Sequence, residues 1–176
     1  IEIASTQNEY GKSLISEVCL YFEYKLYRAN RTTKINAEHF EAFTSPNCLP
    51  LAESGVHLKF NKQLIKVNKS NKPIQIRKQL CDDIVILKLF PGITEQVVKS
   101  ILNIKNLKGV ILETYGSGNA TTKTWFITLL HQAIKKGIKI INVSQCAGGS
   151  VIMGKYETSI KLIEIGVISG FDITTE

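Results

Sequence analysis

From Ile84 to the end of the chain, short apolar runs alternate with stretches of helical periodicity, and this alternation constrains the fold more than any other feature. The apolar runs begin near residues 84, 108, 138 and 167. Between them, apolar residues recur at every third or fourth position, which is typical of helices packed on a sheet. The pattern predicts an α/β fold, in which successive right-handed β-α-β crossovers build an open parallel sheet with helices on its faces.

The expected strands cover the apolar runs, at 84–90, 108–113 and 138–143 and from Val167 onward. Three helices are expected between them, from a capping hydroxyl at Thr94, from about Thr122 to a glycine cap at Gly137, and over 156–165. The polar turns 115–119 and 144–150 then lie at the carboxyl edge of the sheet. Open α/β sheets bind ligands at this edge because helix N-termini and free backbone amides converge there.

The first 60 residues lack this alternation and have the pattern of a different domain. The apolar run 18–22 predicts a strand, whereas 25–34 is polar and rich in Arg and Thr. We expect residues 1–60 to be the end of an N-terminal α/β domain, 61–80 to be a linker, and 81–176 to be a smaller, Rossmann-like C-terminal domain with the open parallel sheet. An edge hairpin through 74–76 is an alternative for part of the linker.

Both ends of the chain resemble interrupted helices. Ile1, Ile3 and Ala4 have the spacing of a last helical turn, and 172–176 has the capping residues and the acidic first turn of a helix start. We therefore expect these 176 residues to be part of a longer chain.

The charge and the cysteines limit the classes of partner. The chain has 22 Lys and Arg against 15 Asp and Glu, a net charge of +7, but the excess is spread out and lacks interleaved aromatic residues, so nucleic-acid binding is not favoured. No apolar run reaches the roughly 18 residues of a membrane span. The four cysteines have no zinc-ligand spacing, which indicates reduced thiols in the cytoplasm. No metal or cofactor is expected.

The turn that follows the second strand is the first candidate site. Gly116 and Gly118 lie between a strand and a helix, as in a dinucleotide-binding fingerprint, but Thr121 replaces the third glycine and no ribose-binding acid follows the next strand. The glycines allow a ligand to approach the backbone closely, and Asn119 can project its amide at the helix start. An ordinary tight turn explains the same pattern equally well.

Two other groups have residue types suited to chemistry. Cys146 follows the third strand, but a catalytic thiol needs a histidine base and no histidine has a suitable context, so Ser144 and Gln145 fit better as hydrogen-bonding groups around a polar ligand or an interface. Lys34 stands among hydroxyl side chains and can accept a proton if its pKa is lowered. A solvated basic turn is the common alternative.

Five segments, read in order, are more specific than any of these signals. They are Leu-Tyr-Arg-Ala-Asn-Arg-Thr-Thr-Lys at 26–34, Phe-Glu-Ala-Phe-Thr-Ser-Pro-Asn at 40–47, Tyr-Gly-Ser-Gly-Asn-Ala at 115–120, Gly-Lys-Tyr at 154–156, and Gly-Val-Ile-Ser-Gly-Phe-Asp-Ile-Thr-Thr-Glu at 166–176. Together they resemble the type I, cytoplasmic branch of the bacterial L-asparaginase family.

The resemblance implies a two-domain α/β amidohydrolase that converts L-asparagine to L-aspartate and ammonia through a threonine nucleophile, as a dimer or a dimer of dimers. In that family a Thr-Asp-Lys group activates a nucleophile, and its lysine matches Lys34. The asparagine of the Gly-x-Gly-Asn turn reaches the substrate of the neighbouring subunit, which implies this role for Asn119. An allosteric asparagine pocket in some members corresponds to Ser144, Gln145 and Cys146.

The sequence also departs from the family pattern. Neither the Thr-Gly-Gly-Thr-Ile nucleophile motif nor the Gly-Thr-Asp-Thr motif occurs in it, so we expect both to lie upstream and this piece to be inactive alone. Glu113 stands where allosteric members have an effector-binding arginine, which predicts weak or absent allostery. An ammonia-supplying subunit of a tRNA-dependent amidotransferase and a noncatalytic amino-acid-binding domain stay open as alternatives.

Overall fold

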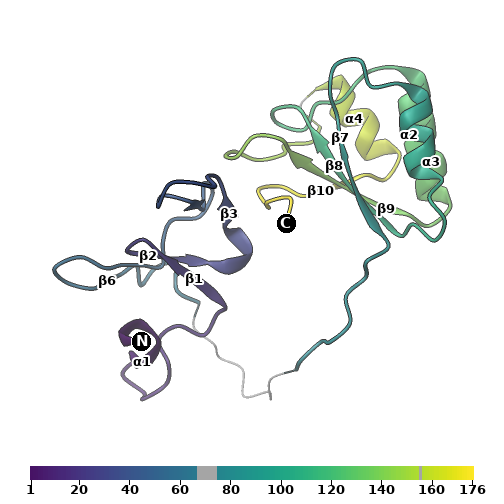
Figure 1. Ribbon diagram of the computed structural model, residues 1–176. Helices are drawn as coiled ribbons and strands as arrows, with labels where there is room; N and C mark the ends of the chain where they lie inside the picture. Colours follow the sequence, from purple (N-terminus) through teal and green to yellow (C-terminus); the bar gives the residue numbers. More distant parts are fainter. Residues whose placement is uncertain (67–74, 155) are drawn as a thin grey trace. The chain divides into compact units, whose positions relative to one another are not determined.

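The computed structural model describes residues 1–66, 75–154 and 156–176 (Figure 1). It divides into two compact units, residues 1–76 together with Glu176, and residues 77–175. The hairpin considered at 74–76 lies partly outside the described residues, and Gln75 and Ile76 belong to no strand. The predicted domain boundaries and linker stay predictions.

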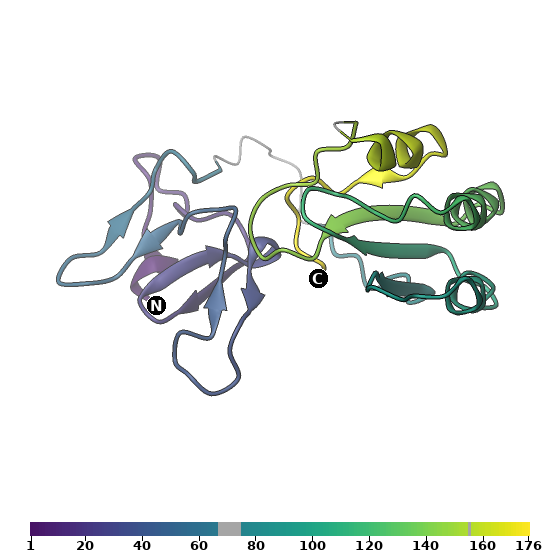
Figure 2. The same ribbon diagram turned by 90° about the horizontal axis from the view of Figure 1, so that it is seen from above.

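The second unit is built on a four-stranded parallel sheet. Its strands are β7 (Ile84–Lys88), β8 (Gly109–Thr114), β9 (Lys139–Ser144) and β10 (Ile168–Ser169). They lie in the order β10-β9-β8-β7, which Figure 2 shows as a row from yellow to teal. The helices between them are α2 (Glu95–Leu102), α3 (Thr124–Lys135) and α4 (Glu157–Glu164). The predicted alternation of strands and helices is therefore confirmed.

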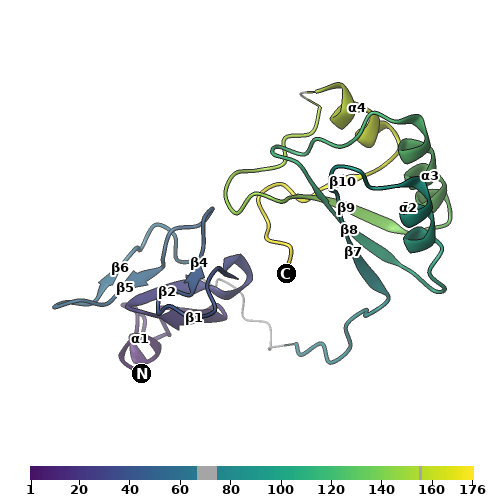
Figure 3. The same cartoon turned by 45° about the horizontal axis from the view of Figure 1, so that its top comes forward.

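All three helices of this unit cover the same face of the sheet (Figure 3). Their apolar side chains share one core with Leu87, Val110, Leu112 and Ile140, which project to that face. Because the spatial order of the strands follows the chain order, connections of one hand place every helix on one side. The expectation of helices on the faces is thus met on one face only. On the opposite face Ile86 is 54% exposed.

The helix ends follow from local chemistry. Thr94 Oγ1 accepts a hydrogen bond from Val97 N at 3.4 Å, so the predicted cap of α2 is confirmed. Helix α3 begins slightly later than expected and has no side-chain cap at Lys123. It ends before Gly137, whose φ of +94° suits a glycine that stops a helix.

The first unit contains a short helix and two antiparallel sheets. Helix α1 is Glu2–Ser5 and a 3-10 turn spans Ala29–Arg31. The larger sheet has the order β1-β2-β5-β6, formed by β1 (Cys19–Phe22), β2 (Lys25–Arg28), β5 (Ala52–Glu53) and β6 (Lys59–Phe60). The smaller sheet pairs β3 (Thr33–Lys34) with β4 (Phe43–Thr44). The strand predicted at 18–22 corresponds to β1, and 172–176 contains no helix.

Candidate functional site

The turn that follows β8 lies at the carboxyl edge of the parallel sheet and is closed by its own backbone. Tyr115 N donates to Asn119 O and Asn119 N donates to Tyr115 O, both at 2.9 Å. Gly118 has a φ of +107°, and a Cβ atom there would lie 2.8 Å from Val151 Cγ1. Only glycine fits this position, so its presence in the sequence is explained by backbone geometry and close packing.

A buried polar pair in the neighbouring strands is hydrogen-bonded to this turn. Thr114 and Asn142 are fully buried at the ends of neighbouring strands, and Thr114 Oγ1 donates to Asn142 Oδ1 at 2.6 Å. Asn142 Nδ2 donates in turn to Gly118 O at 3.3 Å. This pair was not predicted from the sequence. The available signal was an asparagine inside the apolar strand 138–143, because a buried amide needs a partner.

Asn119 itself is half-buried. Its side-chain oxygen Oδ1 accepts a hydrogen bond from Thr158 Oγ1 at 3.3 Å. Thr158 lies in the first turn of α4, far from Asn119 in the sequence. The structure therefore places the predicted substrate-binding amide where the β8 turn meets the start of a helix.

The turn after β9 is tied to the neighbouring strand ends. Ser144 Oγ donates to Gly116 O at 2.6 Å and accepts from Cys146 N at 3.0 Å. Gln145 Nε2 donates to Leu89 O at 2.6 Å and to Glu113 O at 2.9 Å. Both side chains thus hold backbone segments together, whereas the Cys146 residue is exposed. Their predicted role around an effector stays a prediction.

Glu113 lies on the sheet face opposite the helices, and its side chain is only 12% exposed. Thr175 Oγ1 donates to Glu113 Oε1 at 2.6 Å, and Lys88 Nζ is 3.7 Å from Glu113 Oε2. The carboxylate is therefore paired within the second unit. Five of the six predicted site residues gather at this carboxyl edge, namely Glu113, Asn119, Ser144, Gln145 and Cys146.

Lys34 belongs to the first unit and is exposed at the end of β3. Its register partner is Phe43, and Lys34 Nζ lies 5.8 Å from the centre of that ring. A cation over an aromatic face is stabilised by the ring quadrupole. The nearby hydroxyl of Thr32 donates to Arg28 O at 2.8 Å, so it is engaged with the backbone.

Strand β2, which precedes the Lys34 segment, ends in a nearly buried ion pair that was not predicted from the sequence. Arg28 Nη2 donates to Glu17 Oε1 at 2.8 Å and to Leu64 O at 2.9 Å, and Nη1 donates to Cys48 Sγ at 3.3 Å. The side chains of Glu17 and Arg28 are 13% and 14% exposed. The hydrogen bonds from Arg28 hold the pKa of Glu17 below its usual value of 4.5, and Glu17 raises the pKa of Arg28.

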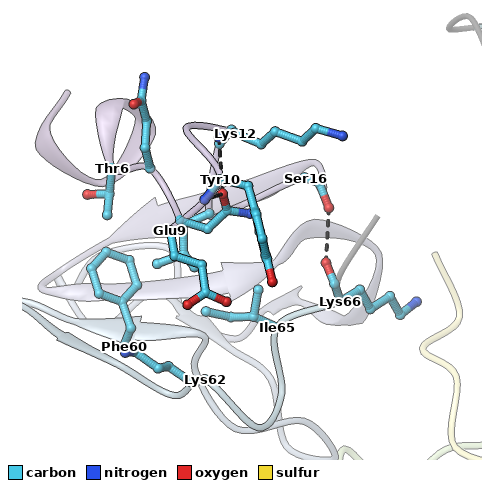
Figure 4. Close-up of a pocket in the computed structure, with 13 residues that line it drawn as sticks. Thr6, Glu9, Tyr10, Lys12, Ser16, Phe60, Lys62, Ile65 and Lys66 are labelled. Carbon is cyan, nitrogen blue, oxygen red and sulfur yellow. Dashed lines mark hydrogen bonds between the residues drawn. The ribbon is translucent and has the colours of Figure 1, made fainter. Parts of the chain in front are cut away.

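The first unit also has an open cavity of about 750 Å³ between the loop 6–16 and the segment 60–66 (Figure 4). Glu9 and Tyr10 extend from the loop toward Ile65, and Ser16 Oγ donates to Lys66 O at 3.0 Å at its side. None of the predicted site residues lines this cavity. The cavity is therefore separate from the sites predicted from the sequence.

Within 1–66, 75–154 and 156–176, no three His, Cys, Asp or Glu side chains form a set able to hold a metal ion. None of the helices in this part of the chain is long and apolar enough to cross a membrane.

Two family models match the chain. Residues 83–176 match the glutaminase/asparaginase C-terminal domain, and residues 1–66 match the asparaginase N-terminal domain. The chain belongs to the asparaginase family. Both matches agree with the resemblance found in the sequence.

Individual relatives also match the chain. L-asparaginase 1 of Escherichia coli K12 is 38% identical over 167 residues, which cover 92% of this chain and 47% of that protein. The human 60 kDa lysophospholipase is 39% identical over 166 residues, which cover 94% of this chain and 29% of that protein. The crystal structure of L-asparaginase I from Vibrio cholerae superimposes with a TM-score of 0.84 at 35% identity, covering 92% of this chain and 48% of that one. The chain thus spans less than half the length of these proteins.

Proposed function

We propose that the intact protein hydrolyses L-asparagine to L-aspartate and ammonia. The observation that carries this proposal is the match of both asparaginase domain models, together with 38% identity to L-asparaginase 1 of Escherichia coli. Asn119 would bind the substrate through its side-chain amide. Its place at the carboxyl edge of a parallel sheet, beside a helix start, supports this role.

The proposed nucleophile is a threonine that lies outside these 176 residues. A threonine hydroxyl is a weak nucleophile at its ordinary pKa and needs a base to take its proton. The matching position in the family motif assigns this task to Lys34. Because a guanidinium keeps its proton, Lys34→Arg retains the charge but cannot act as the base.

Ammonia release from L-asparagine by the intact protein tests the proposal directly. We expect Lys34→Ala and Lys34→Arg each to lower kcat by about 100-fold or more, as loss of a general base does. A Lys34→Arg variant with wild-type kcat would show that only the charge matters. Parallel assays with L-glutamine decide which amide is preferred.

Oligomeric state and location are part of the same proposal. We expect a dimer or a dimer of dimers in the cytoplasm, in which Asn119 of one subunit serves the active site of its neighbour. Light scattering coupled to gel filtration measures the assembly. Mixing weakly active Asn119→Ala subunits with Lys34→Ala subunits should raise the activity above that of either variant alone, because one mixed site then receives both wild-type residues.

The identity of residue 113 bears on allosteric regulation by asparagine. A carboxylate that is 12% exposed repels the carboxylate of an amino-acid effector, since two like charges at close range raise each other's energy. We therefore predict a hyperbolic dependence of the rate on asparagine concentration. A sigmoidal curve for the intact wild-type protein would contradict this prediction.

A second candidate function has its own observation. The human relative is named a lysophospholipase, so ester hydrolysis of lysophospholipids needs a direct test. Fatty-acid release from lysophosphatidylcholine without ammonia release from asparagine would favour it.

A glutamyl-tRNA(Gln) amidotransferase component from Methanobrevibacter smithii is more distant, at 28% identity over 152 residues. Calorimetric binding of asparagine without hydrolysis would instead favour a noncatalytic domain.

A further inference from the structure

We infer that Thr158 is a positioning residue, which orients the side-chain amide of Asn119 so that its NH2 group faces the substrate. The inference rests on the proposed function, because it assumes that Asn119 binds asparagine. Its basis is the contact of 3.3 Å between Thr158 Oγ1 and Asn119 Oδ1, which joins the turn after β8 to the first turn of α4.

The backbone of the turn cannot orient this amide by itself. The two hydrogen bonds between Tyr115 and Asn119 fix the main chain of Asn119. The terminal torsion of an asparagine side chain is broad and nearly two-fold, so the oxygen and nitrogen can exchange places at low cost. A hydrogen-bonding partner is needed to hold the amide in one place and one plane.

The hydroxyl of Thr158 is such a partner, because in the structure it donates to Oδ1 and so holds that end of the amide toward α4. With Oδ1 engaged, Nδ2 is the end left for a ligand, and among the described residues it donates to no acceptor. An amide NH2 group offers two donors, which suit the carboxylate or the side-chain carbonyl of L-asparagine. In the orientation that this contact holds, Asn119 presents hydrogen-bond donors to a ligand acceptor.

Thr158 is itself firmly held at the start of α4. The neighbouring Ser159 is fully buried, donates to Tyr156 O at 2.7 Å and accepts from Gly154 N and Tyr156 N, both at 3.1 Å. This network fixes the first turn of the helix. A threonine in a helix is limited to about two χ1 rotamers, so ordering the hydroxyl of Thr158 has a small entropic cost.

Steady-state kinetics of the intact protein with L-asparagine test the inference. We expect Thr158→Val, which keeps the shape but removes the donor, to raise KM by about three- to ten-fold, the effect of one lost hydrogen bond, with kcat changed less than about two-fold. Thr158→Ser keeps the donor and should restore KM to near the wild-type value. The matched control is Thr128→Val in α3, whose exposed hydroxyl donates only to Thr124 O.

A double-mutant cycle separates positioning from an independent effect. In an Asn119→Ala background, Thr158→Val should have no further effect on KM, because the group that it orients is gone. Equal effects in both backgrounds would overturn the inference, as would a Thr158→Ser variant as impaired as Thr158→Val or a Thr158→Val variant with wild-type KM. A wild-type protein that releases no ammonia from asparagine would instead overturn the proposed function, and the inference with it.

Discussion

Gly118 combines a left-handed backbone with close packing, and the two effects can be separated by mutation. Gly118→Ala would place a Cβ atom 2.8 Å from Val151 Cγ1 at a φ of +107°. We expect it to destabilise the protein by about 2–4 kcal/mol, since strain and overpacking add. Gly92→Ala has a similar φ of +89° with no atom within 4 Å, so it should cost only about 1 kcal/mol. Thermal unfolding measures both, and equal losses would contradict the packing argument.

The ion pair of Glu17 with Arg28 predicts a pH dependence of stability. Because folding lowers the pKa of Glu17, the stabilisation is present above the usual value of 4.5 and is lost as the pH falls through the lower, folded-state pKa. Wild-type stability should therefore drop more steeply between about pH 5 and about pH 3 than that of Glu17→Gln.

Urea denaturation at several pH values checks this prediction. At neutral pH, Glu17→Gln should cost about 1–3 kcal/mol, because Arg28 loses a charged acceptor while 14% exposed. The double variant Glu17→Gln/Arg28→Met serves as the control, since it leaves no unpaired charge. Parallel pH profiles of stability for wild type and Glu17→Gln would show that this ion pair is not the source of the pH dependence.

Single residues were predictable where a local rule applied. Thr94 was recognised as a cap because a hydroxyl before an apolar-periodic stretch has this function at many helix starts. Asn119 was singled out by its glycine neighbours. The partnership of Asn119 with Thr158, and that of Thr114 with Asn142, join residues 39 and 28 positions apart. No pattern within a single segment encodes such pairs.

At the scale of elements, the start of α2 gives a direct test of capping. Thr94→Ala removes the acceptor for Val97 N and should lower stability by about 1 kcal/mol. Thr94→Ser retains an acceptor and should be nearly neutral. Thermal unfolding of the two variants measures the difference, and an equal loss in both would show that the methyl group, not the hydroxyl, stabilises this helix start.

The elements of the second unit were predictable from sequence, whereas in the first unit the prediction found β1 but not the short strands β3 to β6. Strands β7 to β9 have five or six residues each, built around apolar runs such as 84–87 and 110–112, and the helices between them have a clear apolar stripe. In the first unit, β3, β4, β5 and β6 have two residues each, too few for an alternating pattern. Their pairing depends on contacts between distant segments.

At the scale of the whole molecule, the segment 75–82 is exposed and belongs to no helix or strand. We expect trypsin to cut the intact protein first after Arg77 or Lys78, because exposed irregular backbone fits a protease most easily. Lys139 is also exposed but lies within β9, so it should be protected and acts as an internal control. Mass spectrometry of early digests identifies the sites. First cuts within 84–169 would contradict the prediction.

The strand order of the second unit has a consequence for how the chain is made. Each strand pairs with the strand that precedes it along the chain, and each helix packs on the face already formed. A ribosome therefore releases the β-α units in the order in which they dock, and no strand waits for a later one to separate it from a neighbour. Domains begin to fold during synthesis, and short-range pairing is fast. This half of the molecule is suited to growing its sheet one strand at a time while the rest is still being translated.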